Sequence, residues 1–270
     1  MDKYAVIGNP IEHSKSPQIH AEFARQTGES LEYSRLLGNP DDFEGDVRRF
    51  LTAGGQGLNV TVPFKEQAWR LADELSDRAH TAGAVNTLIR MDNNQLRGDN
   101  TDGIGLVRDL IMNNGFRMRG KRVLILGAGG AVRGVLRPLL EEQPKRLIIA
   151  NRTAAKAYAL ATGLSEFGPV AGCGLDELEG MTFDLIINGT AAGLDGRIPD
   201  VPDSILATGG WCYDMFYSNE PTAFQQWGQD HSAERALDGL GMLVEQAAES
   251  FRLWRDILPE TGPVIRILRG

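Results

Sequence analysis

The chain has 270 residues, more than the roughly 100–200 residues of a usual single core, so two domains are the leading expectation. Apolar residues make up 42% of it, the formal net charge is −8, and no basic run is present, which favours an ordinary globular protein and makes nucleic acid an unlikely partner. Because no apolar run approaches the ~18 residues that span a bilayer and the first residues do not resemble a signal peptide, we expect no membrane partner and a cytoplasmic location.

Short β-rich runs alternate with helix-length amphipathic runs, which predicts an α/β protein with mostly parallel sheets. The first set of strands is expected at 3–8, 31–37, 57–62 and 83–91, with a hairpin through Asn93 and Asn94 into 95–98. A second set, which predicts a second sheet, is expected at 121–127, 146–151, 183–189 and 209–217. A final amphipathic helix is expected at 241–256.

Two serines follow the first expected strand, in "GNPIEHSKSPQIH". Pro17 suits the first turn of a helix, so Ser16 is a natural N-cap residue. A helix cap and a ligand contact are both open for Ser16, whereas Ser14 has less structural reason to be there.

The third expected strand leads into a corner, "NVTVPFKEQ". The strand period of two places Asn59 and Thr61 on one face. Pro63 ends the strand, and Lys65 follows at the expected start of a helix. Without further context, Lys65 would be a solvated lysine paired with Glu66 or Asp73.

Asn86 lies in the fourth expected strand, and Asp102 stands just before a helix, where a carboxylate can cap exposed N–H groups. Ligands of open α/β sheets bind at the strand ends. The serines, amides, Thr61, Lys65 and Asp102 together therefore predict a lining suited to a polyhydroxylated acid.

The segment "RVLILGAGGAVRG" is an apolar strand that runs directly into Gly127, Gly129 and Gly130, with a helix expected from Ala131. Glycines let a backbone approach a diphosphate, and the positive end of the helix dipole attracts its charge. Val132 replaces the last glycine of the G-x-G-x-x-G pattern, with small residues at Ala131 and Gly134 available for helix packing. A mere strand-to-helix turn is the alternative.

The next expected strand ends in Asn151, Arg152 and Thr153, with Lys156 following. An NAD-binding unit usually presents a carboxylate at this point, and none is present. Because a guanidinium can grip a 2′-phosphate, NADP is favoured over NAD. The alternative is an exposed arginine at a helix start.

Cysteine and histidine patterns indicate neither a metal site nor a disulfide framework. Cys173 and Cys212 are the only cysteines, and neither belongs to a CxxC pair. The four histidines show no paired ligand spacing.

Seven motifs in consistent order, from Tyr4 to about Ile267, resemble those of the shikimate dehydrogenase family: "HSKSP", "NVTVPFKE", "GAVNT", "GDNTDG", "GAGGA", "NRT" and "DGLGMLVEQA". The resemblance implies reversible, NADPH-dependent reduction of 3-dehydroshikimate to shikimate, a step in chorismate and aromatic amino acid biosynthesis. It also implies a substrate domain at 1–103, completed by a returning C-terminal helix at 240–270, and a Rossmann-like NADP-binding domain at 104–239.

The resemblance assigns two sets of residues by motif. The implied substrate contacts are Ser14, Lys15, Ser16, Asn59, Thr61, Asn86, Asp102, Tyr217 and Gln246. The implied cofactor contacts are Asp77, Gly127, Ala128, Gly129, Gly130, Ala131, Asn151, Arg152, Thr153, Ala154, Ala155, Lys156, Met215 and Gly239.

The proton chemistry is expected from Lys65 and Asp102. Hydride transfer to a ketone leaves negative charge on the carbonyl oxygen, which a lysine can neutralise with its charge and its proton. An ion pair with Asp102 would keep Lys65 charged for proton donation, and in shikimate oxidation the deprotonated lysine would accept the hydroxyl proton.

Two rival functions remain open. One is a quinate/shikimate dehydrogenase with relaxed substrate or NAD use, and the other is a non-catalytic NADP-binding sensor. The expected partners are small molecules, and the expected assembly is a monomer or a homodimer.

Overall fold

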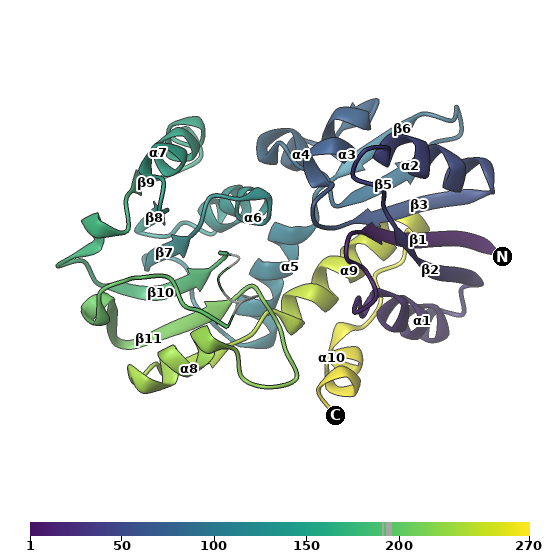
Figure 1. The fold of residues 1–270 in the computed structure, drawn as a ribbon. Coiled ribbons are helices and arrows are strands. Elements are labelled where there is room, and N and C mark those ends of the chain that lie inside the picture. Colours follow the sequence, from purple (N-terminus) through teal and green to yellow (C-terminus); the bar gives the residue numbers. More distant parts are fainter. Residues whose placement is uncertain (191, 193–195) are drawn as a thin grey trace. The chain divides into compact units, whose positions relative to one another are not determined.

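The structure is a computed structural model that describes residues 1–190, 192 and 196–270. The chain divides into two compact units, and the described strands of each form a six-stranded sheet (Figure 1). Unit 1 comprises Met1–Gly105 and Leu243–Gly270, and unit 2 comprises Leu106–Met242.

Unit 1 contains a mixed, mostly parallel sheet with the strand order β2-β1-β3-β5-β6-β4. β5 is antiparallel to its neighbours β3 and β6, and the remaining pairs are parallel. The strands are β1 (Asp2–Gly8), β2 (Leu31–Leu37), β3 (Gly55–Val60), β4 (Glu74–Leu75), β5 (Thr87–Arg90) and β6 (Leu96–Asp99).

Helices cover both faces of this sheet, because alternate strand residues are apolar on either side. Ala5 and Ile7 pack in one core with α2 (Phe43–Thr52), α3 (Lys65–Leu71) and α4 (Asp77–Ala82). On the other face, Tyr4 stacks on Trp254 of α9 at 4.6 Å between ring centroids. The helices whose apolar residues form the core on this second face are α1 (Ser16–Thr27), α9 (Leu240–Arg255) and α10 (Thr261–Arg269).

Unit 2 is a doubly wound α/β unit. Its strands are all parallel in the order β12-β11-β10-β7-β8-β9, which reverses direction between β7 and β10. They are β7 (Arg122–Leu126), β8 (Arg146–Ala150), β9 (Val170–Cys173), β10 (Phe183–Asn188), β11 (Leu206–Asp214) and β12 (Arg235–Leu237).

Successive residues of β7 point to opposite faces of the second sheet. Val123 and Ile125 face α6 (Gly130–Glu141) and α7 (Ala154–Gly163), whereas Leu124 and Leu126 belong to the core that includes α8 (Ala223–Asp230). α5 (Asp102–Arg108) continues into a π-helical turn at Asp109–Asn113, and short 3₁₀ turns lie at Asp176–Leu178 and Asp203–Ile205.

The α/β class, the two sheets and the long helix near the C-terminus agree with the prediction, as does the hairpin between β5 and β6. The predicted strand at 83–91 is wrong at its start, because β5 begins only at Thr87. β4, β9 and β12 were not predicted, since strands of two to four residues carry too little alternation to be recognised. The nine-residue helix α10 was also not predicted.

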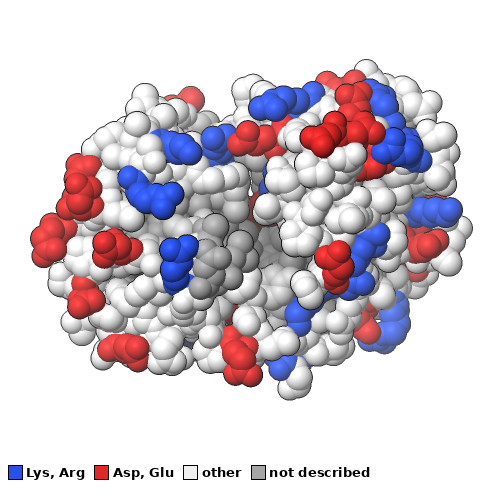
Figure 2. All heavy atoms as spheres, viewed as in Figure 1, with Lys and Arg blue, Asp and Glu red and all other residues white. Residues whose placement is uncertain are grey.

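Charged side chains of both signs are interspersed on the face drawn in Figure 2. Among the residues that the structure describes, no helix has the length and apolar character required to cross a membrane.

An aromatic cluster behind the first sheet contains a buried histidine, His20 of α1. Its ring stacks on Tyr33 at 4.1 Å with an interplanar angle of 6°. Neither ring nitrogen has a hydrogen-bond partner among the described residues. Burial lowers the pKa of His20 to about 3, and the nearby Asn59 side chain offsets only part of this effect. His20 therefore stays neutral in the folded protein.

This histidine makes stability dependent on pH. Between about pH 3 and pH 6.5 the unfolded chain binds a proton at His20 and the folded chain does not, so the free energy of unfolding falls as pH falls through this window. We expect His20→Leu to reduce that slope by up to about 1.4 kcal/mol per pH unit in urea titrations at several pH values. The exposed His80 provides the control, His80→Leu, and equal slopes in wild type and His20→Leu would contradict the expectation.

Candidate active site

The corner after β3 is anchored by a buried aromatic residue. The Val62–Pro63 peptide is cis, and Phe64 is fully buried and stacks on Phe43 at 4.9 Å. α3 then begins at Lys65, whose carbonyl oxygen accepts a hydrogen bond of 2.9 Å from the Val85 N–H. The backbone of Lys65 is thus attached to the segment that carries Asn86.

The Lys65 side chain turns inward and pairs with Asp102. Lys65 Nζ lies 2.5 Å from Asp102 Oδ2, and the two side chains are only 16% and 7% exposed. The other carboxylates considered for this lysine have different neighbours: Glu66 faces Arg70, and Asp73 accepts from the Leu96 N–H. The geometry is that of a half-buried ammonium held against a buried carboxylate.

Asn86 connects this ion pair to α9. It lies immediately before β5 rather than inside a strand, and its Nδ2 is 2.8 Å from Asp102 Oδ1 and 3.1 Å from Gln246 Oε1. Asp102 is the first residue of α5, at the same edge of the sheet. Lys65, Asp102 and Gln246 thus come from three different helices. Asn86 connects Asp102 with Gln246, because its Nδ2 donates to both side chains.

The serine loop differs from the prediction. α1 begins at Ser16, and Lys15 occupies the N-cap position without a side-chain capping bond, so the Ser16 side chain is not the predicted cap. Instead, Ser14 Oγ accepts from the Ser16 N–H at 3.3 Å, and Arg35 binds the Ser14 carbonyl at 2.6 Å. Ser14 therefore has a structural role that the sequence did not reveal.

Asn59 and Thr61 have different environments. Asn59 is 6% exposed, accepts a 2.7 Å hydrogen bond from the Tyr33 hydroxyl and donates one of 2.9 Å to Ser250 Oγ. β3 ends at Val60, so Thr61 lies beyond it, half-buried, with no hydroxyl partner among the described residues. Thr61 has a hydroxyl available for a ligand, whereas the Asn59 amide is already used inside the protein.

In unit 2, the glycine loop leaves open space before a helix. Gly127 has φ 108°, and a Cβ there would lie 3.0 Å from the Gly189 carbonyl oxygen. α6 begins at Gly130, one residue earlier than predicted, and a Cβ at Gly129 or Gly130 would meet no atom within 4 Å. Packing within the chain thus does not account for these two glycines. Bare backbone at the N-terminus of a twelve-residue helix fits a diphosphate.

Val132, in place of the last glycine of the nucleotide pattern, is fully buried under the second sheet. Gly189 allows α6 to approach the sheet closely at Val132, because a Cβ at Gly189 would lie 2.4 Å from Val132 Cγ2. The glycine that allows helix and strand to pack closely thus lies after β10 instead of in α6.

The turn between β8 and α7 carries Arg152. Asn151 Nδ2 donates to the Thr153 carbonyl at 3.0 Å, which shapes the turn, and Thr153 is the N-cap residue of α7. Arg152 and Lys156 are exposed and have no ion-pair partner among the described residues. Ala154 and Ala155 form the first turn of α7. Two cations and a helix N-terminus at one strand end suit a phosphate group.

The remaining predicted cofactor residues lie in two places. Met215 and Gly239 are adjacent, since a Cβ at Gly239 would lie 2.4 Å from the Met215 carbonyl oxygen. Tyr217, predicted to contact substrate, follows in the same segment and is half-buried. Asp77 belongs to unit 1, where it is the exposed first residue of α4.

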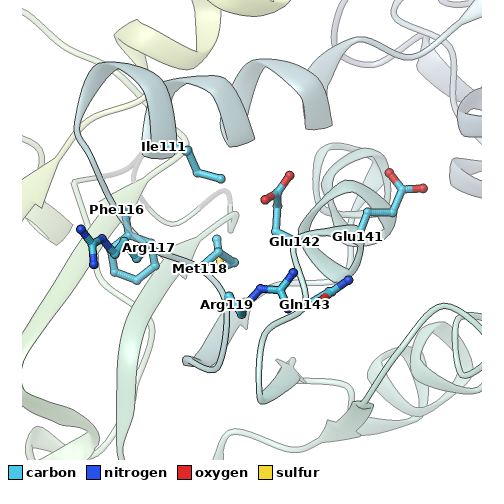
Figure 3. A pocket seen from close by; sticks show the side chains of 8 residues that line it. All are labelled: Ile111, Phe116, Arg117, Met118, Arg119, Glu141, Glu142 and Gln143. Carbon is cyan, nitrogen blue, oxygen red and sulfur yellow. The ribbon is translucent and has the colours of Figure 1, made fainter.

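A cavity of about 320 Å³ in unit 2 contains none of the predicted site residues (Figure 3). Residues from the segment after α5 and from the end of α6 and the turn that follows it line this cavity: Ile111, Phe116, Arg117, Met118, Arg119, Glu141, Glu142 and Gln143.

Three buried hydroxyl residues around the cluster were missed from the sequence. Thr87, Thr101 and Ser250 are fully buried and hydrogen-bond to Asn86 or Asn59. Their only sequence signal is a polar residue at a core position, which is common and unspecific.

Comparison with known proteins identifies the family. Residues 6–88 match the shikimate dehydrogenase substrate binding domain, residues 110–194 the shikimate/quinate 5-dehydrogenase domain, and residues 239–269 the shikimate 5′-dehydrogenase C-terminal domain. The chain is 56% identical over 268 residues to the shikimate dehydrogenase (NADP(+)) of Alkalilimnicola ehrlichii, covering 99% of this chain and 98% of that protein.

Solved structures agree with this match. An Ael1 enzyme from Pseudomonas putida is 44% identical, with a TM-score of 0.92 over 100% of this chain and 99% of that one. A Thermus thermophilus shikimate 5-dehydrogenase in complex with NADP(H) and shikimate is 30% identical, with a TM-score of 0.88 and the same coverage. By sequence over its whole length and by fold, this chain belongs to the shikimate dehydrogenase family.

Proposed function

We propose that this protein reduces 3-dehydroshikimate to shikimate with NADPH, reversibly, in the shikimate pathway. The observation that carries the proposal is the ion pair between Lys65 and Asp102, a 2.5 Å contact between an ammonium and a carboxylate among the polar side chains at one edge of the first sheet. Relatives named for this reaction and this cofactor, matched over nearly the whole chain, support it.

Bound NADPH would supply a hydride to the carbonyl carbon of the substrate. As negative charge develops on the carbonyl oxygen, the Lys65 ammonium stabilises it and donates its proton, so that an O–H bond forms while an N–H bond breaks. Asp102 holds Nζ in place through the 2.5 Å contact with its Oδ2. In the direction of oxidation, neutral Lys65 accepts the hydroxyl proton.

Substrate recognition is assigned to groups at the same edge of unit 1. Ser14, Lys15, Ser16 and Thr61 follow β1 and β3, and Asn86, Asp102 and Gln246 form the cluster next to Lys65. The proposed substrate contacts also include Tyr217 of unit 2 and Asn59, although the Asn59 amide already hydrogen-bonds to Tyr33 and Ser250. Hydroxyl and amide groups suit a substrate with several hydroxyls and a carboxylate.

Cofactor binding is assigned mainly to unit 2. The backbone at Gly127–Ala131 would receive the diphosphate, and the Asn151–Lys156 turn would receive the 2′-phosphate. Met215 and Gly239 would line the nicotinamide, with Asp77 of unit 1 as a further contact. The substrate, in contrast, would bind mainly to unit 1, which includes residues 243–270.

One absorbance assay tests the function. Purified protein is given shikimate or quinate with NADP or NAD, and formation of the reduced nicotinamide is followed. We expect the highest kcat/KM for shikimate with NADP. Equal efficiency with quinate or NAD would favour the relaxed enzyme, and no turnover with any pair would contradict the proposal.

The role of Asp102 gives a further expectation. Asp102→Ala should lower kcat and raise the KM for shikimate, because the variant loses both the partner of Lys65 and a substrate contact. Asp102→Asn keeps an oxygen for Asn86 but removes the charge, so its KM should change less than its kcat. Steady-state kinetics at saturating NADP measures both, and an unchanged kcat in both variants would contradict the role.

The cytoplasmic location and the choice between monomer and homodimer stay predictions, the second of which light scattering of the purified protein would test.

A further inference from the structure

Ser250 of α9 is a fully buried hydroxyl that joins several polar groups of unit 1. Its Oγ lies 2.9 Å from Asn59 Nδ2, 2.8 Å from Thr87 Oγ1 and 3.0 Å from the Gln246 carbonyl oxygen. Its neighbours along the helix, Ala247 and Phe251, belong to an apolar core. Placing a hydroxyl at such a position costs free energy unless its hydrogen bonds are made, and here they are.

The hydroxyl of Thr87 continues this connection toward the ion pair. Thr87 Oγ1 donates to Asn86 Oδ1 at 2.9 Å, and Asn86 Nδ2 donates to Asp102 Oδ1 at 2.8 Å. The other oxygen of Asp102 accepts from Lys65. Because Thr87 gives its only hydroxyl proton to Asn86, Ser250 is the donor in its 2.8 Å contact with Thr87 Oγ1. With this direction, the series of hydrogen bonds runs unbroken from Ser250 to the lysine.

The series fixes which way the Asn86 amide points. Asn86 Oδ1 accepts from the Thr101 N–H at 2.9 Å as well as from Thr87. A flipped amide would place its NH₂ group against these donors and its oxygen against the Asp102 carboxylate. Both contacts would be repulsive, so the observed orientation depends on the donors behind Asn86.

We propose that Ser250 and Thr87 are positioning residues for proton transfer: their hydroxyls hold Asn86 so that its amide keeps the Asp102 carboxylate directed at Lys65. This inference rests on the proposed function of the Lys65–Asp102 pair. Neither hydroxyl touches Lys65 or Asp102 directly; both act through Asn86.

Three variants test the assignment. Thr87→Val keeps the shape of the side chain and removes its hydroxyl, Ser250→Ala removes the other hydroxyl, and Thr87→Ser keeps the hydroxyl. We expect the first two to lower kcat by roughly tenfold to a hundredfold, because small displacements of reacting groups have effects of this size, with little change in the KM for NADP. Thr87→Ser should retain kcat to within about threefold.

A matched control separates this effect from the loss of any helix hydroxyl. The Thr27 hydroxyl of α1 lies 2.8 Å from the carbonyl oxygen four residues earlier, as the Ser250 hydroxyl lies 3.0 Å from that of Gln246, but Thr27 has no contact with the series. Thr27→Ala should leave kcat unchanged, with folding of all variants checked by circular dichroism and thermal melting.

The outcomes distinguish the two proposals. If the wild type oxidises shikimate with NADP, folded Thr87→Val and Ser250→Ala enzymes with wild-type kcat would overturn the positioning role alone. A failure of both to fold would assign the hydroxyls to stability and also overturn it. A wild type that turns over no substrate would overturn the proposed function and this inference with it.

Discussion

Replacing Lys65 by alanine should lower kcat by about 10²–10⁴, the usual contribution of a positioned acid or base, while the KM for shikimate changes little. The variant loses the proton donor and the positive charge next to the developing oxyanion, and both act mainly in the transition state. Steady-state kinetics in the direction of shikimate oxidation measures the effect, and near-normal turnover would remove Lys65 from the mechanism.

A second replacement separates charge from proton transfer. Lys65→Arg keeps a cation opposite Asp102, but a guanidinium stays protonated in proteins and cannot act as the base in shikimate oxidation. Its kcat should therefore remain low. Arg70 is the matched control, because it is an exposed cation on the same helix that pairs with Glu66 at 3.8 Å. Arg70→Ala should have wild-type kinetics.

Replacing Arg152 by alanine should raise the KM for NADP by roughly tenfold to a hundredfold, the value of a charge-assisted hydrogen bond of about 1.5–3 kcal/mol. The KM for NAD should change far less, because NAD has no 2′-phosphate. The guanidinium is exposed and has no ion-pair partner among the described residues, so its removal should leave the fold intact. Steady-state kinetics at saturating shikimate, with NADP and with NAD, measures how much the KM for each cofactor changes between the wild type and the variant.

The opposite end of the same strand supplies the control for this change. Arg146 is the exposed first residue of β8, whereas Arg152 follows its last residue. Arg146→Ala changes the net charge equally and should leave the KM for NADP unchanged. An equal increase in both variants would attribute the effect to the general field of the protein rather than to a phosphate site.

Much of the fold could be predicted because long apolar runs have a clear period. The run at β7 is buried on both faces, as its continuous apolar sequence indicated, and α9 begins one residue before its predicted start. Short edge strands such as β4 and β12 could not be predicted, since their few residues acquire their structure from pairing with a neighbour.

The site could be predicted at the level of residue type and motif, but several local roles could not. Ser16 stood where an N-cap was expected, yet Ser14 provides the hydrogen bond to its N–H. Val132 stood where a glycine was expected, and the required glycine is Gly189, 57 positions further along the chain. Which residue fulfils an expected role depends on which atoms the fold brings within contact distance.

The sequence by itself determined the α/β class, the glycine loop, the arginine at the end of β8 and the family, because each is encoded in a local pattern. The family resemblance predicted the pairing of Lys65 with Asp102, but only the tertiary structure shows their 2.5 Å contact and decides that Asn86, Gln246, Thr87 and Ser250 stand behind that pair. The physical reason is distance along the chain: a hydrogen bond of about 3 Å between residues 160 positions apart leaves no periodic trace in the sequence, and only folding brings its two atoms together.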